Sequence, residues 1–156
     1  MNIAASEKDV SHEWISPSID MNKTVSMIEV HSEGGYQVWS CDYDGRLFVW
    51  SISPENHPVF EGELTDASWN PKTDGRPYCL AQVTEDQVWV GIATGTVMAW
   101  EIHTRHLASS QCQPLSSQHP DAHTRSIRSL QIVPASKPPV VWSSSQDRTF
   151  RRFSWK

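Results

Sequence analysis

The chain has 156 residues and a formal net charge of −5, and 38% of its residues are hydrophobic, including eight tryptophans. This size is typical of one small domain, and the many tryptophans argue against a disordered chain. The acidic balance argues against a general nucleic-acid binder, because phosphate contacts require clustered Lys and Arg. We also expect no membrane span, no disulfide framework and no secretory signal, and therefore a soluble cytoplasmic protein.

The first predicted elements lie in and just after an N-terminal segment, residues 1–24. Within this segment His12-Glu13-Trp14-Ile15 is a candidate outer strand, and the next strand is predicted over Val25–His31. Further first strands are predicted over Tyr78–Val83 and Ile127–Val133, because these stretches are rich in β-branched, aromatic and other apolar residues.

A repeat of about fifty residues organises the rest of the chain. Residues 37–52, 87–102 and 140–155 align without a gap. Each unit is typical of a β-hairpin, since two apolar runs flank a polar turn in which glycine supplies a positive φ in the first two units. Three sets of positions coincide, namely Trp39, Trp89 and Trp142, then Gly45, Gly95 and Arg148, and finally Trp50, Trp100 and Phe153.

Weaker fourth stretches follow two of the hairpins, over Pro58–Leu64 and Leu107–Leu115. Four short strands in about fifty residues are typical of a propeller blade. The sequence therefore predicts an all-β fold, a partial, three-bladed β-propeller of antiparallel four-stranded blades. Residues 25–76 form blade 1, residues 77–122 form blade 2, and residues 123–156 form blade 3, which lacks its outer strand.

The third unit resembles the WD40-repeat family. His123 stands where that family has its Gly-His before the first strand, and the run from Ser144 to Thr149 resembles the Ser-x-Asp-x-Thr turn. The resemblance implies a hydrogen-bonded structural network in which His123, Ser144 or Ser145, and Asp147 supply three members. The fourth member is a tryptophan in the family, and Phe153 stands in its place.

A second resemblance concerns the first unit. The run from Val38 to Trp50 reads Val-Trp-Ser-x-x-x-Asp-Gly-Arg-x-x-x-Trp and is similar to repeats in the propeller region of plant-type inositol-polyphosphate 5-phosphatases. This resemblance implies a regulatory propeller segment that binds phosphorylated ligands, phosphoinositides included. A Gly-Gly doublet in every blade, typical of kelch repeats, is missing.

Three blades leave open faces, because closed propellers have four to eight blades. We expect completion by a second copy, which would make a six-bladed ring, or by another polypeptide. Residues 123–156 carry seven basic and one acidic side chains, whereas residues 1–122 carry six basic and 17 acidic ones. Head-to-tail contact is therefore electrostatically favoured. Arg152 stands where Val49 and Ala99 stand in the other units, so it lies on an open face or meets a carboxylate.

The function expected from these features is a non-catalytic protein-interaction scaffold, with no catalytic residues, no cofactor and no metal. No nucleophile or phosphate-loop motif occurs. His103, His106, Cys112, His119 and His123 lie close in sequence, but their spacing fits no common zinc module. The candidate partner-binding residues are Trp69, predicted to be an exposed anchor in a polar stretch, and the arginines Arg125, Arg148 and Arg151.

Overall fold

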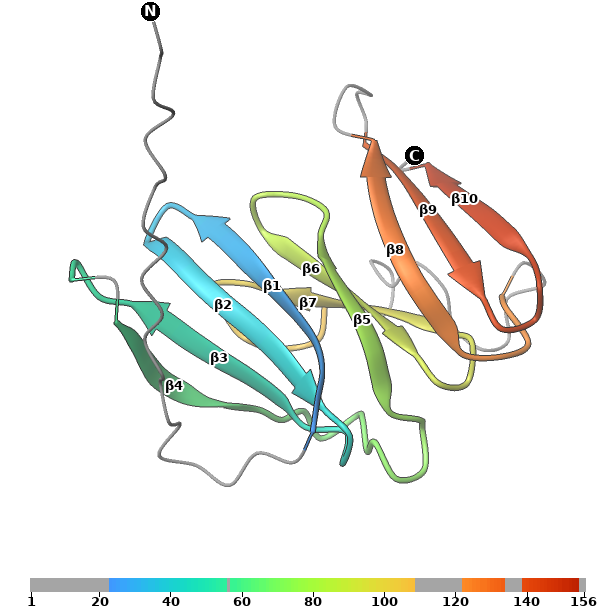
Figure 1. Ribbon diagram of the computed structural model, residues 1–156, viewed down its shortest axis with the longest axis horizontal. Helices are drawn as coiled ribbons and strands as arrows, with labels where there is room; N and C mark the ends of the chain where they lie inside the picture. Colours follow the sequence, from blue (N-terminus) through green and yellow to red (C-terminus); the bar gives the residue numbers. More distant parts are fainter. Residues whose placement is uncertain (1–22, 56, 109–121, 134–138, 155–156) are drawn as a thin grey trace, which may run out of the picture.

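The computed structural model describes residues 23–55, 57–108, 122–133 and 139–154, and within these ranges the chain is all-β with no helix (Figure 1). The described strands form three antiparallel sheets, each built from one repeat unit. We call these sheets blade 1, blade 2 and blade 3 in chain order. The predicted all-β fold of three antiparallel blades is confirmed.

Blade 1 has four strands in the order β1-β2-β3-β4. The fourth strand falls on the predicted stretch, and the tight turn between β2 and β3 reverses at Gly45, whose φ is +92°. The buried carboxylate of Asp42 fixes this turn, since it accepts hydrogen bonds from Arg46 N at 2.9 Å and Arg46 Nε at 2.8 Å. The strands are β1 (Thr24–Ser32), β2 (Gly35–Asp42), β3 (Leu47–Ile52) and β4 (Pro58–Leu64).

Blades 2 and 3 each have three described strands. The predicted fourth strand of blade 2 is represented by an isolated bridge between Leu107 and Trp100, and the rest of that stretch lies outside the described residues, as does His12–Ile15. The strands are β5 (Pro77–Gln82), β6 (Gln87–Ile92) and β7 (Val97–Glu101) in blade 2, and β8 (Ile127–Val133), β9 (Val140–Ser145) and β10 (Phe150–Ser154) in blade 3.

The blades lie side by side with their first strands next to one another (Figure 1). Strand β5 contacts β1 and β2, and strand β8 contacts β5 and β6. Blades 2 and 3 thus each lay their first strand against the first two strands of the preceding blade. This arrangement is that of a partial β-propeller.

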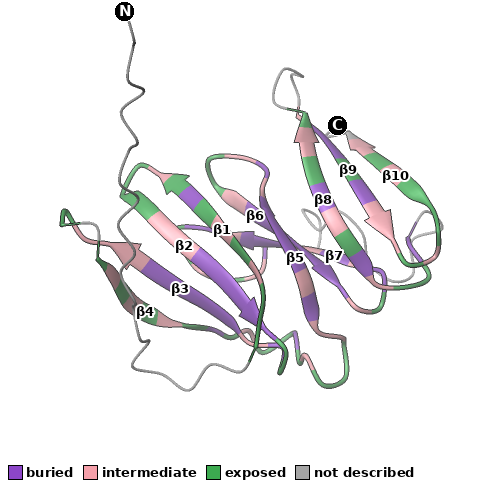
Figure 2. Ribbon diagram, viewed as in Figure 1, coloured by how far each residue is buried: buried purple, intermediate pink, exposed green. Residues whose placement is uncertain are grey.

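The core lies between the blades, as the buried strand segments in Figure 2 show. We call the face that a blade turns toward the following blade its forward face, and the opposite one its backward face. Forward Trp39 of blade 1 shares one buried cluster with backward Leu80 and Trp100 of blade 2. Forward Trp89 of blade 2 shares a second cluster with backward Leu130 of blade 3. Alternation along each strand produces both faces.

The tryptophans of the hairpin strands are buried in blades 1 and 2, whereas Trp142 of blade 3 is not. Trp142 stands at the position of Trp39 and Trp89, yet its exposed fraction is 43%. It is exposed because no other blade among the described residues covers the forward face of blade 3. Arg152, paired with Trp142 across the ladder, is exposed on that same face, in agreement with the open-face alternative.

Candidate functional site

A buried hydrogen-bond network occupies the contact between blades 2 and 3. His123 Nδ1 lies 2.9 Å from Asp147 Oδ2, and His123 Nε2 lies 2.7 Å from Ser143 Oγ. Thr149 Oγ1 donates to Asp147 Oδ1 at 2.6 Å. We assign the proton of the ring to Nδ1, facing the carboxylate, so that Nε2 accepts from the serine hydroxyl. His123 is thereby held in one orientation.

The network corrects the predicted serine. Neither Ser144 nor Ser145 contacts His123, and the hydroxyl that does belongs to Ser143. Ser143 lies on the backward face of β9, whereas the side chain of Ser144, one residue further along, points the other way. Ser145 Oγ instead accepts from Asp147 N at 3.1 Å and donates to Arg125 O at 2.8 Å, so it organises the turn.

Asp147 is ionised in this network. Burial raises the pKa of its carboxyl, but hydrogen bonds from Thr149, His123 and the Thr124 amide outweigh burial and lower that pKa well below its usual value. An ionised acceptor strengthens each of these hydrogen bonds. A buried, satisfied carboxylate of this kind has a structural role, because its lone pairs are already used by the protein.

The other two blades hold fragments of the same arrangement. In blade 1, Trp50 Nε1 donates to Ser40 Oγ at 3.3 Å, and these residues correspond to Phe153 and Ser143 of blade 3. Phe153 cannot donate, and its ring packs at 6.3 Å from the ring of Trp89. In blade 2, Trp100 Nε1 has no hydrogen-bond partner, since Val90 stands where Ser40 supplies the acceptor in blade 1.

Trp69 is not an exposed anchor, and this prediction is wrong. Its exposed fraction is 8%, and its ring packs edge-on against Trp100 at 5.9 Å between the centroids. The residue belongs to the core between blades 1 and 2, where Leu80 also lies. Polar neighbours in the sequence suggested exposure, but the link between blades turns this one side chain inward.

The basic residues of blade 3 divide into two groups. Arg125 and Arg148 lie on the same rim, because the loop before β8 is hydrogen-bonded to the β9–β10 turn by Ser145. Arg128 joins them, with its guanidinium 4.7 Å above the ring of Tyr78. We call these three arginines the basic rim. Arg151 is separate, since its Nε lies 3.4 Å from His123 Nδ1 and its side chain is half-buried.

Arg148 has a φ of +70°, a left-handed conformation. The corresponding residues of the other blades are Gly45 and Gly95, with φ of +92° and +94°. Such a conformation costs a residue with a Cβ about 1–2 kcal/mol relative to glycine. The turn therefore places a charged side chain at the rim at some cost in stability.

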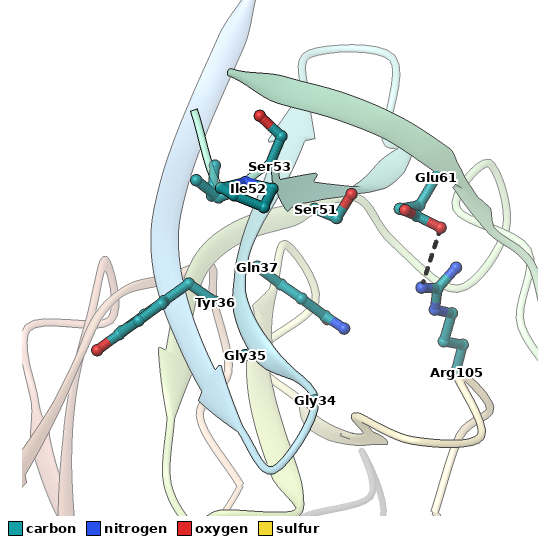
Figure 3. Close-up of a pocket in the computed structure, with 10 residues that line it drawn as sticks. Gly34, Gly35, Tyr36, Gln37, Ser51, Ile52, Ser53, Glu61 and Arg105 are labelled. Carbon is teal, nitrogen blue, oxygen red and sulfur yellow. Dashed lines mark ion pairs between the residues drawn. The ribbon is translucent and has the colours of Figure 1, made fainter. Parts of the chain in front are cut away.

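A groove of about 460 Å³ lies beside the β1–β2 turn of blade 1 (Figure 3). The turn between β1 and β2, including Gly35 and Tyr36, forms one side of it, and the end of β3 forms another. Arg105, which follows β7 of blade 2, reaches across to Glu61 at 3.6 Å. Sequence reasoning missed this groove because its lining comes from two blades. Since Arg105 is already paired, the groove offers little to an anion.

The histidine candidates for a metal site are dispersed. His103 pairs with Asp86 at 3.4 Å and His106 with Asp66 at 3.8 Å, while His123 is held in the network. Cys112 and His119 lie outside the described residues. In the part of the chain that the structure describes, no group of three or more metal-ligating side chains comes together. Nor do those residues include a helix with the length and apolar character needed to cross a bilayer.

Comparison with protein-family models and with curated proteins gave no match. Comparison with solved structures gave matches at low sequence identity. One is a chain of a crystal structure of the mitotic checkpoint complex, at 12% identity and a TM-score of 0.52, over 97% of this chain and 44% of that one. This chain therefore spans less than half the length of that similar structure, and the likeness concerns the fold.

Two computationally designed proteins are also similar. Ika4 matches at 17% identity and a TM-score of 0.44, over 94% of this chain and 100% of that one. Ika8 matches at 18% identity and a TM-score of 0.42, over 86% of this chain and 46% of that one. The fold and the network together define the class: a WD40-like β fold of three blades, arranged as part of a propeller.

Proposed function

We propose that this chain is a non-catalytic protein-interaction scaffold whose basic rim binds an acidic segment of a protein partner. The observation that carries the proposal is the pair of arginines, Arg125 and Arg148, on adjacent loops that are tied together by Ser145. Both lie at the surface of the rim, and Arg148 holds its place in a backbone conformation suited to glycine. A fold-only likeness to a chain from a multiprotein complex is in keeping with such a role.

The chemistry of the rim favours carboxylates or phosphates. A guanidinium donates two parallel hydrogen bonds to a carboxylate, and a rigid turn lowers the entropy that binding costs. The rim is rigid because the network beneath it fixes the turn from Ser145 to Thr149 through Asp147. His123 thus supports binding without contacting the partner.

A binding assay with defined peptides tests this function. Acidic peptides labelled with a fluorophore, and the same peptides with Gln and Asn in place of Glu and Asp, are titrated with the protein. We expect saturable binding of acidic peptides only, weakened at least tenfold in Arg125→Glu/Arg148→Glu. The control Lys72→Glu/Arg105→Glu makes the same charge change elsewhere and should bind as the parent does. Equal binding by both double variants would contradict the proposal.

The second candidate function is a regulatory propeller segment of a protein similar to inositol-polyphosphate 5-phosphatases, with the basic rim binding a phosphorylated ligand. The same three arginines favour it, because bidentate contacts suit phosphate as well as carboxylate. Flotation with vesicles that contain phosphatidylinositol bisphosphate separates the two candidates. Retention that is lost in Arg125→Glu/Arg148→Glu, without acidic-peptide binding, would favour the phosphoinositide.

A further inference from the structure

The two contacts between blades follow one rule. In each, the forward tryptophan of one blade shares a buried cluster with a leucine on the first strand of the next: Trp39 of β2 with Leu80 of β5, and Trp89 of β6 with Leu130 of β8. All four side chains are at most 6% exposed. Forward and backward faces are thus complementary, and each blade presents one of each.

Among the described residues, no other blade covers the forward face of blade 3 or the backward face of blade 1. On the forward face of blade 3, Trp142 is 43% exposed and Phe150 is 77% exposed, although the matching Leu47 and Val97 are buried. On the backward face of blade 1, Met27 of β1 is 65% exposed. Its register partner Ser40 shows that Met27 stands where Leu80 and Leu130 stand in the next blades. Blade 3 therefore has an exposed tryptophan, Trp142, with no aliphatic side chain from a following blade against it. Blade 1 has an exposed aliphatic side chain, Met27, with no tryptophan from a preceding blade against it.

We infer that the forward face of blade 3 docks on the backward face of blade 1 of a second copy of this chain, and that two copies close head to tail into a six-bladed ring. In this arrangement β1 of the second copy lies along β8 and β9, as β5 lies along β1 and β2 within one chain. Met27 then covers Trp142, and a methionine sulfur against an indole ring is a favourable contact.

The charges of the two faces agree with this occupant. Arg152 is exposed beside Trp142, and no ion pair of Arg152 is found among the residues that the structure describes. The backward side of blade 1 carries Glu29, two residues from Met27, whose side chain is 60% exposed and lies 3.5 Å from His31 Nε2. Two forward faces would bring the Arg152 side chains of both copies together, whereas a backward face brings Glu29 toward Arg152.

The exposed part of the backward face of blade 1 lies on its first strand, β1. Phe48 and Trp50, on β3 of the same backward face, are already buried, with Phe60 packed beside Trp50 at 5.1 Å. Strand β1 supplies the exposed part of this face, since Met27 on it is 65% exposed. The second copy therefore docks along β1.

Light scattering coupled to size-exclusion chromatography tests the inference on the full chain. We expect a mass of twice 17.7 kDa for the parent protein. Trp142→Glu/Phe150→Glu removes the forward face and Met27→Glu the backward one, and each variant should have the mass of one chain. Val59→Glu changes an exposed residue on the outer strand β4 and should keep the doubled mass. Thermal unfolding of each monomeric variant checks that it is folded, since substitutions at exposed positions change stability little.

Mixing the two monomeric variants makes the test specific to head-to-tail docking. The mixture contains one intact pair of faces, so a one-to-one complex should form although neither variant associates alone. A parent protein that stays at the mass of one chain at all concentrations would overturn the inference. A doubled mass that survives in Met27→Glu would also overturn it, because the forward faces would then meet each other. A series of larger species would exclude closure by two copies.

Discussion

Gly95 lies where the turn of blade 2 touches the loop that carries His123, and an alanine there should separate the two blades. A Cβ added to Gly95 would lie 2.0 Å from the carbonyl oxygen of His123, 2.6 Å from its carbonyl carbon and 3.0 Å from Arg125 O. All three atoms belong to the backbone, so no side chain can rotate away. Gly35 is the matched control, because its φ is +109° and nothing lies within 4 Å of an added Cβ.

The magnitude is set by the difference between these two glycines. Both substitutions force an alanine into a positive φ, which costs about 1–2 kcal/mol, and both recover about 0.4–1 kcal/mol from the stiffer unfolded chain. Gly35→Ala should therefore lose about 1 kcal/mol of the free energy of unfolding. Gly95→Ala adds an overpacking cost of about 1–3 kcal/mol, and displacement of the loop weakens the bond from Ser126 Oγ to Ala93 O, about 1 kcal/mol more.

Urea unfolding followed by tryptophan fluorescence measures the difference. We expect Gly95→Ala to lose about 2–4 kcal/mol more than Gly35→Ala, which for a slope of about 1–3 kcal/mol per molar urea shifts the midpoint by roughly 1 M or more. Equal losses in the two variants would refute the close approach of blade 2 to the His123 loop, and with it the packing of blade 3 against blade 2.

Three further predictions concern buried groups. Phe153→Trp should stabilise the protein by about 1 kcal/mol in chemical denaturation, because the indole N–H can donate to the serine of the network as Trp50 does in blade 1; a loss of stability would show that the ring does not fit beside the ring of Trp89. The pKa of Asp147 is lowered in the fold, so its contribution is present above its unfolded pKa of about 3.9 and is lost as the pH falls through and below that value. Asp147→Asn should therefore lose about 1.5–3 kcal/mol at pH 7 and be less sensitive to acid than the parent, and an unchanged acid titration of stability would contradict this. Burial raises the pKa of the Cys41 thiol to about 11 and that of the Cys79 thiol to about 12. In a variant with Cys112 replaced by serine, the native protein should therefore react with a disulfide reagent at pH 8 only after denaturant is added. Rapid labelling of the native variant would contradict the burial of these two thiols.

The repeat made most of the fold predictable from the sequence. Strands β4 and β8 coincide with their predicted stretches, and β1 and β5 lie within one residue of theirs. The six hairpin strands lie within two residues of the three aligned runs. Arg151 and Arg152 lie on opposite faces of β10, as the alternation of side chains along a strand requires. These features are local, since each strand carries its own pattern of apolar side chains.

The errors arose where a contact between strands or between blades decides the outcome. Three consecutive serines, Ser143 to Ser145, look equivalent in the sequence, and only the register of β9 against β8 selects Ser143 for His123. Trp69 looks exposed from its neighbours, and only the cluster between blades 1 and 2 buries it. Trp142 looks like Trp39 and Trp89, and it differs because no other blade among the described residues covers it. None of these distinctions can be seen in a single strand taken alone.

The asymmetry of contacts along the blades has a consequence for cooperativity. Blade 2 has a neighbour on both sides, whereas each end blade has one described neighbour. In a stack of this kind the stability of each unit is the sum of its own free energy and of the interfaces it shares. In a single chain, as in the monomeric variants, fraying should therefore begin at the end blades and reach blade 2 last. Amide hydrogen exchange should therefore be slowest in β6 of blade 2. The native state would unfold as a short series of coupled units rather than in one all-or-none step.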